Sequence, residues 1–127
     1  MSKSVIQTSN APKAIGTYSQ GIRTKNLVFT SGQIPINPKT SKLIIGNFKE
    51  EVHQVLTNLE GVLIGGGSSL QFVVKLTVFL IDLSYFAQVN EVFNSFFPKD
   101  PPARSAVQVS ALPMNARIEI EAIGYVE

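Results

Sequence analysis

Two acidic residues near the C-terminus are spaced so that their carboxylates could act together in a reaction. Arg117, Glu119 and Glu121 alternate with apolar residues in a segment typical of a β-strand. Because neighbouring side chains on a strand point to opposite faces, both carboxylates project from the same side. They form either a solvated strand face or a site in which one carboxylate holds or activates a water molecule. The spacing leaves both interpretations open.

A single arginine follows a proline pair and could bind a carboxylate. Arg104 comes directly after Pro101, Pro102 and Ala103. The restricted proline backbone would fix the guanidinium at the start of a strand. The planar fork of donors on an arginine matches a carboxylate in two parallel hydrogen bonds. The alternative interpretation is an ordinary surface arginine at a strand edge.

Other groups that often carry chemistry are excluded or interpreted as structural. His53 is the only histidine, so neither a histidine-based triad nor a multi-histidine metal site can be built, and we interpret it as a surface residue. The chain has no cysteine, which excludes disulfides, thiolate metal sites and cysteine nucleophiles. The run of glycines and serines over 65–69 lacks the GKS or GKT ending of a phosphate-binding loop, and we interpret it as the end of a helix.

Two amphipathic helices are predicted to support these residues. Apolar residues recur at helical spacing over 47–63, with polar residues such as Glu51 and Asn58 on the rest of the circumference. A second helix, capped by Asp82 or Ser84, has one apolar side and stops at proline 98.

Short β-rich segments surround the helices. The apolar segment around Ile22 and residues 27–31 suggest a hairpin that turns at Lys25 and Asn26. The next segment, GQIPINPKTSK, contains prolines and a glycine, so it is a loop or an edge segment rather than a central strand.

Three more strands complete the predicted sheet. Residues 72–81 alternate so that Val74 shares one face with Leu76, while Val73 lies on the other face. Two final strands are expected near 105–109 and 117–126.

The composition and element order indicate one α+β or α/β domain with a mixed sheet and helices on one face. The 127 residues suffice for one domain, and the apolar fraction of 44% suffices for one core. Charged residues make up only 16%, and no third layer is available to cover the other sheet face. We therefore expect a partner subunit to cover it.

The charge and hydropathy patterns disfavour two classes of partner. The net charge of +2 is scattered rather than clustered, which disfavours a dedicated nucleic-acid binder. The uncharged stretches are shorter than a membrane span of roughly 18 apolar residues, so no membrane partner is expected. The start of the chain lacks the pattern of a secretory signal or an organelle presequence, and we expect a cytoplasmic protein.

The chain resembles the YjgF/YER/Rid family, the reactive intermediate deaminases, over nearly its whole length. The stretches that carry the resemblance are AIGTYSQGI, TSGQIPINP, VFLIDLSYFAQVNEVFNSFF and PPARSAVQVSALPMNARIEIEAI. The resemblance implies a single domain over 1–127 with a chorismate-mutase-like α+β fold. It also implies a homotrimer in which three sheets form a central barrel, with the helices outside and active clefts between subunits.

The resemblance also implies roles for individual residues. Arg104 corresponds to the carboxylate-binding arginine of the family, and Glu119 to its water-positioning glutamate. The positions expected to line the cleft are Tyr18, Ser31, Gly32, Asn90 and Ala106. Many members have a cysteine where this chain has Ala106, so a thiol-dependent step is excluded here, whereas backbone contacts from that position are retained.

The implied activity is hydrolysis of reactive imine and enamine acids. Substrates such as 2-aminoacrylate, 2-iminobutanoate and 2-iminopropanoate would give 2-keto acids and ammonia, a hydrolase reaction at a C=N bond. We expect neither a metal nor an organic cofactor. Two alternatives remain open: an RNA-binding endoribonuclease that inhibits translation, and a non-catalytic trimer that senses ligands or acts like a chaperone.

Overall fold

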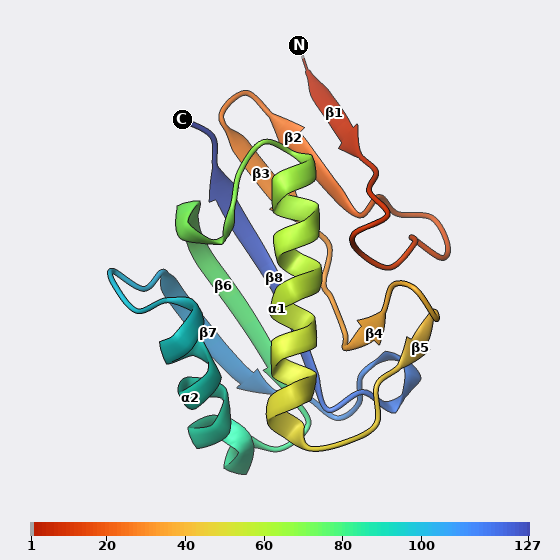
Figure 1. Cartoon of the computed structure of the whole chain (residues 1–127), viewed down its shortest axis with the longest axis vertical. Coiled ribbons are helices and arrows are strands. Elements are labelled where there is room, and N and C mark those ends of the chain that lie inside the picture. The colour runs from red at the N-terminus through yellow and green to blue at the C-terminus, as the bar shows by residue number, and fades with distance from the viewer. Residues whose placement is uncertain (1) are drawn as a thin grey trace.

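The computed structural model describes residues 2–127. The chain folds into a six-stranded mixed sheet with two α-helices on one face (Figure 1). Every neighbouring pair is antiparallel except β6 and β7, which are parallel. In spatial order the strands are β1 (Lys3–Ile6), β2 (Gly21–Thr24), β3 (Leu27–Thr30), β8 (Ile118–Tyr125), β6 (Val73–Leu80) and β7 (Ala103–Gln108).

The hairpin and the proline-rich segment agree with the sequence prediction. Strands β2 and β3 are joined by a tight turn in which Lys25 has a φ of 51°. Gln33, near the start of the proline-containing segment, makes an isolated antiparallel bridge to Ile120 of β8. The following residues form a separate two-stranded sheet of β4 (Ile36–Asn37) and β5 (Lys42–Leu43). The edge strand β1, formed by four residues, was not anticipated by the sequence patterns.

The two helices begin and end close to the predicted positions. Helix α1 (Phe48–Gly65) begins at Asn47, whose side chain accepts a hydrogen bond from the Glu50 amide at 2.9 Å. It ends where Gly67 adopts a φ of +90°, a conformation that favours glycine. Asp82 caps the short 3₁₀ turn Leu83–Tyr85 rather than helix α2 (Phe86–Phe96) itself.

Two further 3₁₀ turns lie in the connections. Leu70–Phe72 leads into β6, and Pro113–Asn115 lies between β7 and β8. None of the helices within residues 2–127 combines the length and the apolar character needed to cross a membrane.

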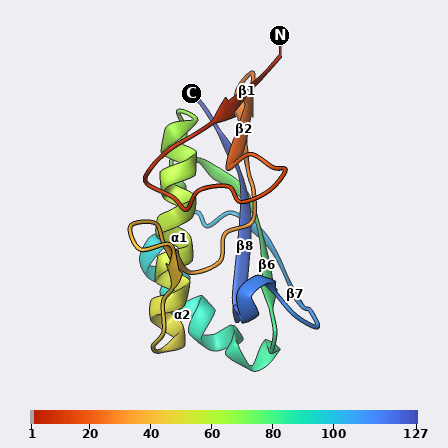
Figure 2. The same cartoon turned by 90° about the vertical axis from the view of Figure 1, so that its right-hand side faces the viewer.

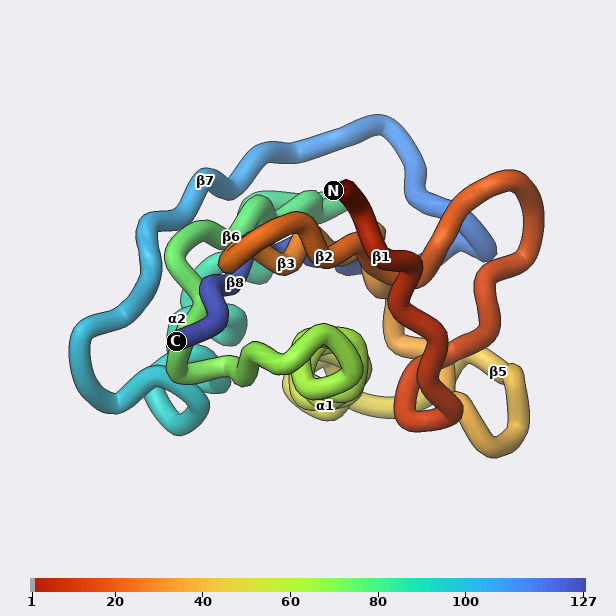
Figure 3. Tube along the Cα trace, turned by 90° about the horizontal axis from the view of Figure 1, so that it is seen from above, coloured from red at the N-terminus to blue at the C-terminus, as the bar shows by residue number. Residues whose placement is uncertain are grey.

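The core lies between the helices and one face of the sheet (Figures 2 and 3). Each fully buried aliphatic side chain there contributes about 1.5–3 kcal/mol through burial. The largest are Leu56, Leu59, Leu63, Leu76, Leu80, Ile118 and Ile120. The α+β prediction with two helices on one face is confirmed.

Two polar residues of α1 are buried, contrary to the prediction that they face away from the core. Glu51 is 5% exposed because it pairs with Arg117. Asn58 is fully buried, and its side-chain amide donates hydrogen bonds to the carbonyls of Ile34 and Ile36 at 3.3 and 2.8 Å. These contacts satisfy polar groups that would otherwise be costly to bury.

The predicted alternation of β6 fails at its first residues. Val73 is buried and Val74 is 45% exposed, whereas the alternation placed Val74 with the buried residues Leu76 and Val78. The register with β8 shifts between Val73 and Lys75, as expected for a β-bulge. The bulge exchanges the faces of Val73 and Val74.

Within residues 2–127 both α-helices lie on one face of the sheet, and the second face carries neither of them, as the side view shows (Figure 2). The strand registers place exposed apolar side chains from both halves of the sheet on this uncovered face: Val5, Leu27, Phe29, Val107 and Tyr125. We call it the open face.

Candidate functional site

Arg104 lies on the edge strand β7 and faces helix α2. Its register partner on β6 is the buried Leu76, so both side chains lie on the helix side of the sheet. The Arg104 Nη1 atom donates a hydrogen bond of 2.7 Å to Asn90 Oδ1. The guanidinium carbon is 4.9 Å from the ring centre of Phe86 and 5.6 Å from that of Phe93.

One stripe of α2 therefore holds the guanidinium. Phe86, Asn90 and Phe93 are four and three positions apart, a spacing that puts their side chains on the same side of a helix. Within residues 2–127 the Nε and Nη2 atoms of Arg104 make no hydrogen bond. That edge of the fork is available for two parallel bonds to a carboxylate.

A cavity of about 370 Å³ opens beside Arg104. Its walls are apolar and amide side chains from α2, β6 and the loop before β7: Leu76, Asn90, Phe93, Asn94, Phe97, Pro101 and Pro102. A carboxylate held by Arg104 would place the rest of a small molecule next to these walls.

Glu119 lies on β8 and on the open face. It pairs with Phe79 of β6, whereas its neighbours Ile118 and Ile120 point into the core. The carboxyl group is half-buried, and this burial, with a smaller contribution from the negative charge of Glu121, raises its pKa. A carboxyl with a raised pKa can both accept and return a proton closer to neutral pH.

Gly32 lies against Glu119, and Ser31 precedes it in the chain. A Cβ atom added at Gly32 would collide with the Glu119 carboxylate, so only glycine leaves room for the carboxylate in this position. The Ser31 hydroxyl donates a hydrogen bond of 2.5 Å to the Ser19 carbonyl, and its backbone amide donates one of 2.9 Å to the Gln20 carbonyl.

Tyr18 lies on the loop between β1 and β2 and is 52% exposed. Its hydroxyl accepts a hydrogen bond of 3.2 Å from the backbone amide of Ile15. The same loop lines a cavity of about 560 Å³, to which Lys13, Tyr18, Ser19 and Gln20 contribute.

Ala106 lies on β7, two residues after Arg104 and on the same side of the strand. Its register partner is the buried Val78, and its side chain packs against the core. The methyl group at this position therefore faces the helix layer.

The expected site residues thus form two groups that one chain does not bring together. Arg104 pairs in register with Leu76 of β6, whose side chain lies on the helix side. Glu119 pairs with Phe79 of β6, whose side chain lies on the open face. Arg104, Asn90 and Ala106 form the first group. Glu119, Gly32 and Ser31 form the second, and Tyr18 is connected to it through the backbone of Ser19 and Gln20.

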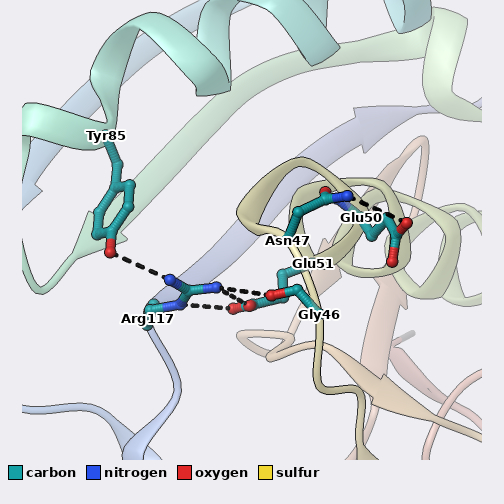
Figure 4. A network of polar contacts seen from close by, with 6 residues as sticks. All are labelled: Gly46, Asn47, Glu50, Glu51, Tyr85 and Arg117. Carbon is teal, nitrogen blue, oxygen red and sulfur yellow. Dashed lines mark hydrogen bonds and ion pairs between the residues drawn. The ribbon is translucent and has the colours of Figure 1, made fainter.

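Arg117 does not join the two carboxylates of β8, although the strand alternation grouped the three residues. It precedes β8 and donates hydrogen bonds to Glu51, to the Tyr85 hydroxyl at 3.1 Å and to the Gly46 carbonyl at 3.3 Å (Figure 4). The hydrogen bonds that Arg117 donates to the Glu51 carboxylate are the main cause that raises the pKa of Arg117. Arg117 is a structural residue.

Three residues that contact the site residues were missed from the sequence. The aromatic contacts of Phe86 and Phe93 with Arg104 could have been found from their helical spacing to Asn90. Nothing in the sequence pattern marked Gln20. His53 is exposed, as expected, and its ring contacts the edge of Phe96 at 5.0 Å between ring centres.

Comparisons with known proteins agree with this arrangement of elements. The family model described as Endoribonuclease L-PSP matches residues 8–126. A RutC family protein of Pyrococcus horikoshii is 50% identical over 125 residues, which cover 98% of this chain and 99% of that protein.

Relatives with more specific names are also similar over nearly the whole chain. A 2-iminobutanoate/2-iminopropanoate deaminase of Rattus norvegicus is 46% identical and covers 95% of this chain and 88% of its own. The crystal structure of E. coli TdcF with bound serine superimposes with a TM-score of 0.93 at 40% identity, covering 98% of this chain and 99% of that one. With the sheet order, the two helices and nearly every residue matched, the chain belongs to the YjgF/YER/Rid family.

Proposed function

We propose that this protein hydrolyses short 2-imino and enamine acids to 2-keto acids and ammonia. Relatives at 46% identity are named as deaminases of this kind, and one relative binds serine, a small amino acid with a carboxylate. The observation that carries the proposal is the guanidinium of Arg104, which α2 holds through Nη1 while the Nε and Nη2 edge faces no acceptor within residues 2–127. This edge suits the carboxylate of an imino acid.

The complete site forms between copies of the chain in this proposal. Arg104 and Glu119 lie on opposite sides of the sheet, so a substrate that touches both must lie between one copy and the next. The apolar side chains of the open face support an assembly, because a partner would remove them from water. We propose a homotrimer whose sheets face one another, with Arg104, Asn90 and Ala106 from one subunit and Glu119, Gly32, Ser31 and Tyr18 from its neighbour.

The chemistry needs orientation and proton transfer rather than a strong nucleophile. The carbon of a protonated imine is already electrophilic, so a positioned water can attack it. Arg104 fixes the carboxylate, and Glu119 holds the water and accepts its proton as the C–O bond forms. The resulting amino-alcohol then collapses: Glu119 returns the proton to nitrogen and takes the proton of the new hydroxyl group. The C=O bond forms as the C–N bond breaks, and ammonia and the keto acid leave.

The proposed roles of the other residues follow from their contacts. Asn90 keeps the guanidinium in place through its 2.7 Å hydrogen bond. The glycine at position 32 leaves space for the carboxylate of Glu119, and Tyr18 lines the cleft from the loop before β2. The apolar walls near Arg104 favour substrates with small side chains.

A coupled assay tests the proposal. A pyridoxal-phosphate-dependent dehydratase generates the imine in situ from serine or threonine, and keto acid and ammonia are measured with and without this protein. We expect keto acid to form faster than in buffer, and Arg104→Ala to remove the acceleration. Binding of 2-oxobutanoate that stabilises the protein without any acceleration would identify a ligand sensor instead.

RNA cleavage is the second candidate, because the matching family model is described as an endoribonuclease. The net charge of +2 provides little attraction for phosphates. A steep decrease of RNA binding with salt, together with cleavage that Arg104→Ala does not affect, would favour this candidate over the deaminase.

A further inference from the structure

The loop between β1 and β2 carries Tyr18, which lies in its exposed outer part. Residues 13–18 are all exposed, whereas Ala11 at the base of the loop is 2% exposed. The loop passes from the flank of α1 to the other side of the sheet (Figure 2). On the α1 side the approach is close, since a Cβ added at Gly61 would collide with the Asn10 carbonyl. The base of the loop is therefore fixed, and its outer part is exposed to solvent.

One buried side chain makes most of the polar contacts at this base. Gln20 is 5% exposed. Its Nε2 atom donates hydrogen bonds to the carbonyls of Thr8, Ala11 and Pro12 at 3.0, 3.2 and 2.7 Å. Its Oε1 atom accepts one from the Thr8 amide at 2.8 Å. A primary amide suits this place because it offers donors to the carbonyls and an acceptor to the amide.

The backbone around Gln20 reaches the second group of site residues. The Gln20 carbonyl accepts from the Ser31 amide at 2.9 Å, and the preceding carbonyl, of Ser19, accepts from the Ser31 hydroxyl. Gly32 follows Ser31 and lies against the Glu119 carboxylate. Gln20 is thus bonded through its side chain to the loop base and through its backbone to the segment beside Glu119.

We infer that Gln20 is a positioning residue that fixes the Tyr18 loop relative to Glu119. It touches no substrate and acts through Tyr18. Its effect on the reaction rests on the proposed function, whereas its effect on the loop can be measured independently. A small misplacement of a group in an active site lowers the rate markedly, so loss of this anchor reduces catalysis without any change in the catalytic side chains.

The test combines substitutions at Gln20 and Tyr18. Gln20→Met keeps the length of the side chain and removes its hydrogen bonds. We expect kcat/KM for the imine to fall by about 10- to 100-fold. In a Tyr18→Ala background the same substitution has no further effect, because the loop no longer carries the group that Gln20 positions. Equal fold-losses in both backgrounds would show that Gln20 acts through general stability and would overturn the inference.

Hydrogen exchange provides a readout that does not depend on activity. We expect backbone amides within 8–18 to exchange faster in Gln20→Met, while those of β8 remain protected. Unchanged exchange in 8–18 would refute the anchor. If the wild-type protein hydrolyses no imine, the proposed function fails and the exchange result alone decides whether Gln20 holds the loop.

Two variants complete the design. Asn58→Leu is the matched control, since it also removes a buried amide that binds backbone carbonyls. Its exchange effect should appear at β4 instead of the Tyr18 loop, and its effect on kcat/KM should be the same with and without Tyr18. Gln20→Asn keeps the amide on a shorter side chain, and it replaces Gln20→Met in every comparison if thermal melting shows that Gln20→Met does not fold.

Discussion

Arg104 and Glu119 are held in position by different physical means. The guanidinium of Arg104 makes a hydrogen bond with Asn90 and lies near two aromatic rings. The carboxylate of Glu119 is half-buried against Gly32, where any larger residue would displace it. One position depends on attractive contacts, and the other on the space that a missing side chain leaves. The hydrogen bond to Asn90 restricts the motion of Arg104 before a substrate arrives, which lowers the entropy lost on binding.

The geometry of the arginine fork gives the first prediction. Arg104→Lys keeps the positive charge and loses the second parallel hydrogen bond to a carboxylate. We expect kcat/KM for imine hydrolysis to fall by about 10- to 100-fold, the effect of one lost charge-assisted hydrogen bond. The control is Arg23→Lys. Arg23 donates hydrogen bonds to the carbonyl of Lys25, in the turn between β2 and β3, and to that of Gly66, at the end of α1. Equal activity of the two lysine variants would refute carboxylate binding by the Arg104 fork.

The raised pKa of Glu119 gives a second prediction, on pH dependence. Burial raises the pKa of Glu119 in the folded state above its value in the unfolded chain. The folded state therefore binds the proton on Glu119 more tightly. The free energy of unfolding therefore falls as the pH rises through the interval between these two pKa values. Glu119→Gln removes this dependence, so the variant should be at least as stable as the wild type at neutral pH, as measured by urea unfolding.

The Glu119→Gln substitution should lower the activity, although it should not lower the stability. We expect kcat of Glu119→Gln to fall by about 10²- to 10⁴-fold, because a general acid and base is lost. The wild-type acidic limb of kcat/KM should lie above the ordinary glutamate pKa of about 4.3. Glu121→Gln is the control: it retains activity, and its acidic limb moves to lower pH because a neighbouring charge is removed. An unchanged acidic limb in Glu119→Gln would exclude this role.

At the scale of elements, an ion pair connects α1 to the start of β8. Arg117 reaches Glu51 of α1, the Gly46 carbonyl before α1 and the Tyr85 hydroxyl before α2 (Figure 4). The rings of Phe48 and Tyr85 stack with 4.2 Å between centres, next to the guanidinium. The network fixes the start of β8, and Glu119 lies on this strand two residues after Arg117.

Removal of one member of this network should be costly. Arg117→Met leaves the buried Glu51 carboxylate without its cation, and we expect a loss of about 3 kcal/mol in the free energy of unfolding. The matched control is Lys49→Met, which breaks the exposed pair with Glu91 and should cost less than about 1 kcal/mol. Urea midpoints at constant m-value measure both changes. Similar midpoints for the two variants would show that Arg117 adds little to stability.

At the scale of the whole molecule, the two halves of the expected site lie on opposite sides of one sheet. The open face carries apolar side chains that water contacts in a single chain. The homotrimer that we propose would account for both facts: copies would associate through the open face and bring Arg104 of one copy near Glu119 of the next.

Subunit complementation checks this arrangement. Arg104→Ala and Glu119→Gln are each expected to be inactive alone. When equal amounts are unfolded together and refolded, each site draws Arg104 and Glu119 from different copies, so about a quarter of the sites receive both wild-type residues. We expect about a quarter of the wild-type activity in the mixture. A mixture as inactive as its components would show that each site draws both residues from a single chain.

The sequence by itself determined both helices, most strands of the main sheet, the two-layer architecture and the identity of the family. Hydrophobic periodicity follows from which side of an element is buried, so it revealed both helices and the central strands. It failed where the buried side changes for tertiary reasons. A bulge exchanges Val73 and Val74, and α1 buries the polar residues Glu51 and Asn58 because distant groups satisfy them.

Only the tertiary structure decided how the site residues are arranged. Strand register assigns Arg104 to the helix side and Glu119 to the open face, and no local pattern encodes the register between strands distant in sequence. The same holds for Gln20, whose four hydrogen bonds reach residues 8 to 12 positions away within an irregular loop. Local sequence specifies which face of an element is apolar, whereas long-range contacts specify which elements meet.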